Sequence, residues 1–230
     1  MSFIKSCDND IYVEHTESKN GKNIFVMPGH GSGVTVSKKI PILREMAKER
    51  GYGFTCFDYA GYGKSGGEPG EWQIEEWLQN ALDVYDFVNT ENNFIIGSSM
   101  GGFLMLALAI LRPEKMKGLV GLMPGFGRSF ARVRKDKPFI GDFNSTVKIK
   151  IGSNTDPFYT FVDGKLDIDL PTFLLTSLGD EEVNYRSSIS ISESLSSKNT
   201  EVMILKDTTH SISDIKDLRH VFDFIDRLKV

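Results

Sequence analysis

The sequence contains little cysteine and no long hydrophobic run. Cys7 and Cys56 are the two cysteines among 230 residues, and they lie far apart in the chain. Cys56 belongs to an apolar run, which favours a buried thiol over a disulfide and indicates a reducing compartment. The longest apolar run, 103–111, is too short to span a bilayer. The first residues lack a basic region followed by a long apolar segment, so we expect no signal peptide and a cytoplasmic protein.

An excess of charge of one sign is also missing. The chain has 27 basic and 31 acidic residues, a formal net charge of −4. This balance gives no reason to expect nucleic acid or an anionic membrane surface as a partner. The hydrophobic share of 40% is ordinary for a globular protein, and 230 residues suffice for one sizeable core. We therefore expect a single domain over 1–230.

Short apolar runs alternate with helix-like segments along most of the chain. This alternation predicts the α/β class, with a mostly parallel central sheet flanked by helices on both faces. In such sheets ligands bind beyond the carboxyl ends of the strands, so functional residues are expected just after each strand. The predicted strands are 11–14, 23–27, 53–57, 93–96, 118–122, 171–176 and 201–205, and the predicted helices are 37–49, 72–89, 100–111, 186–196 and 213–229.

The region 124–169 breaks the alternation, and we interpret it as a short cap inserted over the sheet. Phe126 and Phe130 are two of its six phenylalanines, out of 16 in the chain, which favours an apolar acyl pocket; packing of the cap is the alternative. Arg128, Arg132 and Lys135 would share one face of a helix. A solvated cationic face is the simpler interpretation, and attraction of an anionic leaving group is the more specific functional hypothesis.

The stretch Gly-Ser-Ser-Met-Gly at 97–101 fits Gly-x-Ser-x-Gly, the pattern of a nucleophilic serine in a sharp strand-to-helix turn. Side chains two residues before or after the serine would collide across such a turn. A second match, 63–67, has Ser65 at its centre, but the Gly-Glu-Pro-Gly that follows cannot continue as a helix. Ser99 follows an apolar strand and opens a helix, so Ser99 is the predicted nucleophile.

The loop around Ser65 also matches parts of two nucleotide-binding motifs. Residues 61–66 fit G-x-G-x-x-G, but no helix starts there, which argues against a dinucleotide site. Residues 63–65 are Gly-Lys-Ser, yet a phosphate-binding loop would need glycine where the chain has Asp58. We interpret this segment as a turn-rich connection beside the site.

A serine nucleophile needs a base and an acid. The chain has four histidines, and His210 directly follows the last predicted strand, downstream of Ser99. The order serine, acid, histidine therefore favours His210 as the base. The acid should follow a strand between the two. Asp180 lies at that place, with Glu181 and Glu182 as neighbours, and we predict Asp180 because it is the first acidic residue after the strand.

Several motifs together resemble the α/β-hydrolase family over nearly the whole chain. They are the loop at 27–33, the Asp-x-x-Gly-x-Gly-x-Ser turn at 58–65, the serine turn at 97–102, the acid turn at 179–183 and the histidine loop at 206–213. Within the family, the Pro-Gly at 28–29, the serine turn and the short cap look most like the branch that holds a mitochondrial acyl-glucuronide esterase and palmitoyl-protein thioesterase and their bacterial relatives. The chain departs from the family pattern at Asn184, where proline is common, and the cap matches nothing well.

The resemblance implies a mechanism without a metal or cofactor. The backbone N–H groups of His30 and Met100 would bind the oxyanion, and His30 would act through its N–H rather than as a second base. The expected reaction is hydrolysis of a small-molecule carboxylic ester or thioester through an acyl-enzyme on Ser99. The alternatives are a carbon–carbon bond hydrolase or perhydrolase on the same fold, and a non-catalytic binding protein.

Overall fold

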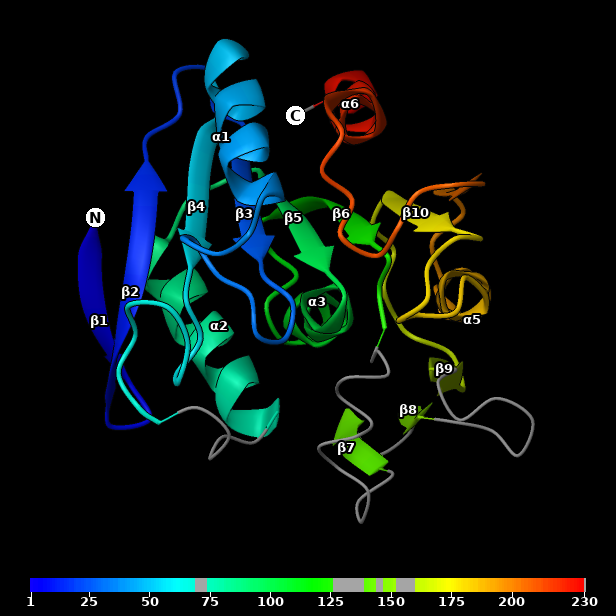
Figure 1. Ribbon diagram of the computed structural model, residues 1–230, viewed down its shortest axis with the longest axis horizontal. Coiled ribbons are helices and arrows are strands. Elements are labelled where there is room, and N and C mark those ends of the chain that lie inside the picture. The colour runs from blue at the N-terminus through cyan, green and yellow to red at the C-terminus, as the bar shows by residue number, and fades with distance from the viewer. Residues whose placement is uncertain (69–73, 126–138, 144–146, 152–159, 230) are drawn as a thin grey trace.

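The computed structural model describes residues 1–68, 74–125, 139–143, 147–151 and 160–229, and its main element is an eight-stranded sheet (Figure 1). The strand order is β1-β2-β4-β3-β5-β6-β10-β11. The strands from β4 to β11 run parallel to one another, whereas β2 pairs antiparallel with both β1 and β4. The bounds are β1 Ser2–Ser6, β2 Asn9–Thr16, β3 Asn23–Met27, β4 Gly53–Phe57, β5 Asn93–Ser98, β6 Met116–Leu122, β10 Thr172–Ser177 and β11 Thr200–Leu205.

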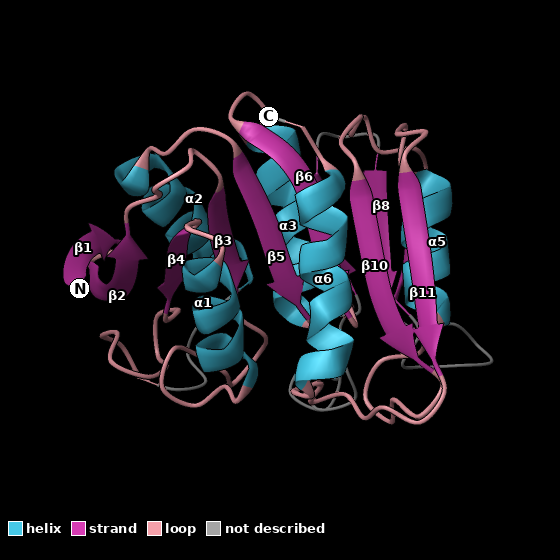
Figure 2. Cartoon of the chain, turned by 90° about the horizontal axis from the view of Figure 1, so that it is seen from above, coloured by secondary structure: helices cyan, strands magenta, loops and turns pink. Residues whose placement is uncertain are grey.

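Helices cover both faces of this sheet. Figure 2 shows α1 and α6 on one face and α2, α3 and α5 on the other. The α/β-hydrolase fold expected from the sequence is confirmed. The helices are α1 Lys39–Glu49, α2 Ile74–Val88, α3 Met100–Leu111, α5 Arg186–Ser194 and α6 Ile215–Arg227.

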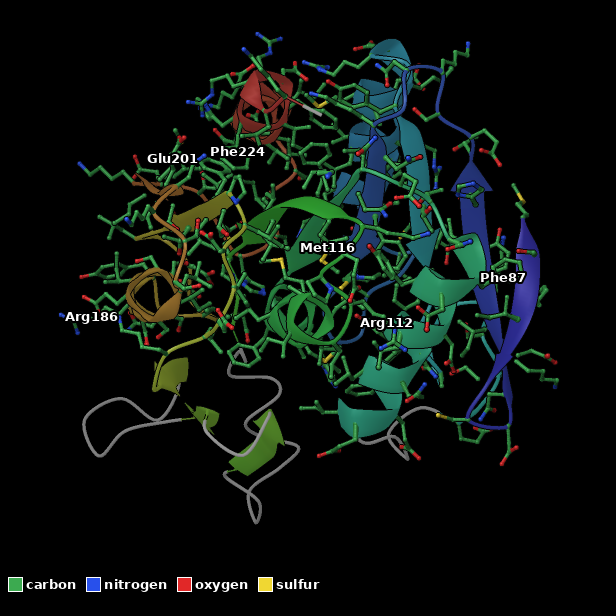
Figure 3. All side chains as sticks on the ribbon, turned by 180° about the vertical axis from the view of Figure 1, so that it is seen from behind. Phe87, Arg112, Met116, Arg186, Glu201 and Phe224 are labelled. Atoms are coloured by element: carbon green, nitrogen blue, oxygen red, sulfur yellow. The ribbon has the colours of Figure 1, made fainter. Side chains whose placement is uncertain are left out.

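The core is divided by the sheet into two apolar layers. Side chains alternate along β5, so that Ile95 packs with α2 and α3 while Ile96 packs with α1 and α6. Phe224 of α6, labelled in Figure 3, stacks on Phe173 of β10. Their ring centroids are 5.5 Å apart. Both faces of the central strands are buried, which explains why they form continuous apolar runs in the sequence.

A second, three-stranded antiparallel sheet lies between β6 and β10 in the chain. It consists of β7 Phe139–Phe143, β8 Val147–Ile151 and β9 Thr160–Asp163. Strand β9 packs against α5, on the side of the main sheet that carries α3 (Figure 1). These strands fall inside the predicted cap, 124–169, where the sequence showed no clear period.

The turn between β5 and α3 brings backbone segments unusually close together. A Cβ atom on Gly97 would lie 2.4 Å from the Gly101 carbonyl oxygen, and one on Gly101 would lie 2.2 Å from the Met27 carbonyl oxygen. Glycine is therefore required at both positions, because any larger residue would push α3 away from β5 or β3. Between these glycines, Ser99 adopts a left-handed backbone conformation with φ 53° and ψ −122°.

We expect the substitution Gly97→Ala to lower the melting temperature by about 2–12 °C. Overpacking of this kind costs about 1–3 kcal/mol or more, and each kcal/mol corresponds to about 2–4 °C for a chain of this size. Gly66→Ala is the matched control, because its nearest neighbour is the tip of the Asn9 side chain, 3.3 Å away. Equal melting temperatures for Gly97→Ala and the wild type would contradict the close packing described here.

Candidate active site

The structure brings the three predicted residues Ser99, His210 and Asp180 into one hydrogen-bonded chain. The Ser99 Oγ lies 3.0 Å from the His210 Nε2, and the His210 Nδ1 lies 2.8 Å from the Asp180 Oδ2. The three residues come from the turn after β5, the loop between β11 and α6, and the turn after β10. They meet because parallel strands deliver their carboxyl ends to the same edge of the sheet.

Backbone hydrogen bonds hold Asp180 in place. Its Oδ1 accepts from the N–H groups of Glu182 and Val183, at 2.8 and 2.9 Å, while its Oδ2 contacts His210. The Asp180 side chain is 0% exposed, whereas Glu181 is exposed. Asp180 is therefore the residue of this acidic turn that reaches the imidazole.

The main chain around Ser99 is fixed by three hydrogen bonds. Its N–H donates to the Leu122 carbonyl at 2.9 Å, and its carbonyl accepts from the N–H groups of Gly102 and Gly125 at 2.9 and 3.1 Å. A left-handed conformation is costly for a residue with a side chain, by about 1–3 kcal/mol, so it persists only where the surroundings impose it. Here they impose it by packing and by these bonds, and the Ser99 side chain is held toward His210.

The loop after β3 passes directly beside Ser99. A Cβ atom on Gly29 would lie 3.2 Å from the Ser99 Cβ, which places the next residue, His30, at the mouth of the site. The His30 ring packs edge-on against Tyr62 and Trp77, with centroids 5.8 and 5.6 Å apart. Burial lowers the pKa of His30, so its imidazole is neutral near neutral pH.

Asp58 joins the loop after β3 to the loop after β4. Its carboxylate is fully buried and accepts from the backbone N–H groups of Val34, at 2.6 Å, and Lys64, at 2.9 Å. A Cβ atom on Gly33 or Gly63 would lie 2.1 or 2.2 Å from an Asp58 carboxylate oxygen. Burial raises the pKa of Asp58. Asp58 thus holds in position the loop that carries His30.

Ser65, the centre of the second Gly-x-Ser-x-Gly match, has a different role. Its hydroxyl donates to the Asp58 carbonyl at 2.6 Å and accepts from the Tyr12 N–H at 2.9 Å. These contacts close the turn after β4. They account for a serine at this position as a structural residue of the turn.

Lys39 is a residue near the site that sequence reasoning missed. It is the first residue of α1, and its Nζ donates to the Ser98 Oγ at 2.8 Å. Burial lowers the pKa of Lys39 to about 8, and the negative charge of Asp180 acts against that shift. No sequence pattern distinguishes Lys39 from a solvated lysine in the first turn of a helix. Its contact with Ser98 depends on how α1 packs on the sheet.

The residues that the structure describes contain no group of three or more histidine, cysteine, aspartate or glutamate side chains that could hold a metal ion. No helix in the same part of the chain is long and apolar enough to cross a membrane. Cys7 and Cys56 are both free thiols. The predicted substrate contacts Phe126, Arg128, Phe130 and Arg132 lie outside the described residues, as does Lys135.

The strand order, the flanking helices and the serine turn define an α/β hydrolase. The chain belongs to the serine aminopeptidase S33 family of these hydrolases, whose family model matches residues 20–157. It is 26% identical over 245 residues to the rat mitochondrial palmitoyl-protein thioesterase ABHD10, covering 99% of this chain and 82% of the relative. The branch of the family inferred from the motifs is therefore confirmed.

Two other comparisons extend this similarity. The structure of mouse α/β hydrolase domain-containing protein 10 superposes with a TM-score of 0.77 at 22% identity, covering 98% of this chain and 96% of that one. The 2-hydroxymuconate semialdehyde hydrolase of Pseudomonas sp. strain CF600 is 34% identical over 117 residues, which are 50% of this chain and 40% of the relative. The first comparison shows a shared fold over the full length, and the second covers half of the chain.

We expect Asp58→Ala to destabilise the protein and to lower its activity together. The buried N–H group of Val34 and the partly buried one of Lys64 would lose their acceptor, at about 1–3 kcal/mol each, so the melting temperature should fall by at least about 4 °C. Asp10→Ala is the control, because Asp10 is an exposed acid whose pairing with Lys5 at the surface contributes little. A melting temperature for Asp58→Ala equal to that of Asp10→Ala would show that Asp58 does not hold the two loops together.

Proposed function

We propose that this protein hydrolyses a carboxylic ester or thioester through an acyl-enzyme on Ser99. The observation that carries the proposal is the continuous chain of contacts from Ser99 through His210 to Asp180, at 3.0 and 2.8 Å. A serine hydroxyl is a weak nucleophile unless an adjacent base removes its proton, and this arrangement supplies that base and orients it. The thioesterase name of the rat relative adds support for this class of substrate.

The reaction follows from the roles of these groups. As the Ser99 Oγ attacks the carbonyl carbon, its proton passes to the His210 Nε2, and the Asp180 carboxylate stabilises the resulting imidazolium. The tetrahedral intermediate collapses when Nε2 gives this proton to the departing alcohol or thiol. Water then attacks the acyl-enzyme, with His210 acting again as the base, and releases the carboxylic acid and free Ser99.

The oxyanion of the tetrahedral intermediate would be stabilised by the backbone N–H groups of His30 and Met100. Met100 is the first residue of α3, so its N–H lies at the helix N-terminus, where donors have no partner within the helix. His30 follows Gly29, whose backbone passes beside Ser99. Donors already in place cost no reorganisation during the reaction, which is why such sites contribute strongly to catalysis.

The rings of His30, Tyr62 and Trp77 pack together, and we expect the partly exposed His30 and Tyr62 to contact an apolar acyl group. The three rings lie in edge-on or tilted contact, with centroids 5.6–5.8 Å apart. From the sequence we expect Phe126 and Phe130 of the predicted cap to add apolar surface for an acyl group, and Arg128 and Arg132 to attract an anionic leaving group. The cytoplasmic location stays a prediction, because the rat relative is a mitochondrial protein.

Carbon–carbon bond hydrolysis is the second candidate function. It is favoured by the 34% identity to 2-hydroxymuconate semialdehyde hydrolase over half of this chain. Product analysis on an ester, a thioester and a β-diketone distinguishes the two functions. Turnover of the β-diketone with no turnover of either ester would assign the protein to the second class.

The substitution Ser99→Ala should lower the turnover of a p-nitrophenyl ester by roughly 10³-fold or more, because the acyl-enzyme can no longer form. A fluorophosphonate probe should label the wild-type protein on the peptide that contains Ser99. Ser65→Ala, which removes a serine from the other motif match, should still be labelled at Ser99. An adduct on any other peptide would overturn the assignment of the nucleophile.

The substitution Asp180→Asn should lower kcat by roughly 10⁴-fold, because the amide favours the wrong imidazole tautomer and cannot stabilise the imidazolium. Glu181→Gln is the matched control in the same turn, and its exposed side chain should cost far less. Steady-state kinetics on one ester measures both. Equal losses in the two variants would show that the turn, and not the Asp180 carboxylate, is what matters.

A further inference from the structure

Lys39 contacts the residue that precedes the nucleophile in the chain. Its ammonium contacts the hydroxyl of Ser98, which ends β5 immediately before Ser99 and is almost completely buried. Ser98 faces the same side of the sheet as α1, since Phe94 and Ile96, at the alternate positions of β5, pack in the layer with α1 and α6. Lys39 therefore links the first turn of α1 to the residue that leads into the strained turn.

The position of this cation is energetically unfavourable. Burial lowers the pKa of Lys39 to about 8, and the partner it contacts is a neutral hydroxyl. Asp180 attracts the ammonium, but both carboxylate oxygens already accept hydrogen bonds, Oδ1 from Glu182 and Val183 and Oδ2 from His210. A buried charge without a directly paired counter-ion destabilises the folded state, so packing alone does not account for this lysine.

We propose, on the basis of the hydrolysis inferred above, that Lys39 is a positioning residue of the active site. Its ammonium fixes Ser98, and with it the main chain that presents Ser99. Its positive charge also lies in the field of the Asp180 carboxylate, the group that orients His210. Both effects prepare the ground state for proton transfer from Ser99 to His210, and neither requires Lys39 to touch the substrate.

The charges around Lys39 determine how activity should depend on pH. Asp180, from the turn after β10, is the charged group whose field acts on the ammonium, and His210, from the loop before α6, contacts the same carboxylate. When Lys39 loses its proton, at a pH of about 8, that positive charge disappears. The wild-type protein should therefore lose activity on the alkaline side of this value.

The stability of the fold should change in the opposite direction. The folded pKa of Lys39 is about 8 and the ordinary value is 10.5, so the unfolded chain binds more protons between these two values. The cost of the buried ammonium is thus fully present below about pH 8 and disappears as the pH rises toward 10.5. Lys39→Met removes this cost, so it should melt no lower than the wild type at pH 7, and the difference between them should shrink at higher pH.

The experiment compares Lys39→Met, Lys39→Arg and the neighbouring exposed control Lys38→Met. We measure kcat and KM for a small neutral ester, and the rate of fluorophosphonate labelling at Ser99, from pH 6 to pH 10.5. Lys39→Met should lower kcat about 10- to 100-fold at pH 7, the scale on which misplaced reacting groups lose rate, with KM unchanged. It should also lack the alkaline decline. Lys39→Arg should recover part of the rate and keep it at high pH, and Lys38→Met should behave as the wild type.

Three results would overturn the positioning role of Lys39. The first is a kcat of Lys39→Met within twofold of the wild type, and the second is a Lys39→Met variant that retains the alkaline decline of the wild type. The third, a Lys39→Met variant that melts well below the wild type at pH 7, would assign a structural role instead. The labelling rate separates this inference from the proposed function, because it needs no substrate. Failure of the wild type to be labelled at Ser99 would contradict the proposed function itself.

Discussion

The site depends on one steric constraint, the close approach of backbone at the turn between β5 and α3. Gly97 and Gly101 allow α3 to begin against the ends of β5 and β3, with Cβ positions 2.4 and 2.2 Å from carbonyl oxygens. This approach leaves Ser99 with a positive φ of 53°, and its hydroxyl lies in contact with the His210 Nε2. The strain is local, and the surrounding apolar layers supply the stability that maintains it. Without this packing the serine would be an ordinary helix-capping residue.

Around this turn, each contributing loop is held by a different kind of interaction. Two backbone N–H groups orient the Asp180 carboxylate, and the buried Asp58 carboxylate joins the loops after β3 and β4. The Lys39 ammonium contacts the Ser98 hydroxyl on the face of the sheet that α1 covers. Each of these groups is a charge removed from water, which costs stability unless partners compensate. The α/β-hydrolase sheet brings the segments to one edge, and the buried charges fix their relative positions.

Much of this arrangement could be predicted from the sequence, because it rests on local signals. The central strands form continuous apolar runs, and the serine, acid and histidine each follow a strand. Strand β1 was missed, since Phe3 and Lys5 are exposed and the strand lies at the sheet edge. The strands β7–β9 were missed because their region shows no clear period. The roles of Lys39 and Asp58 depend on burial and on long-range partners, Ser98 for Lys39 and the Val34 N–H for Asp58, 59 and 24 residues away, which no local pattern encodes.

The position of His210 has a consequence for how the protein would lose its activity on heating. His210 follows β11, which is the outermost strand of its side of the sheet and is only partly buried along its length. Edge elements with few buried contacts open before the core does. Fraying of β11 would separate the imidazole from a nucleophile that stays folded between β5 and α3. The protein would then pass through an inactive native-like state, in which the serine turn is intact and the proton acceptor is absent, before cooperative unfolding begins.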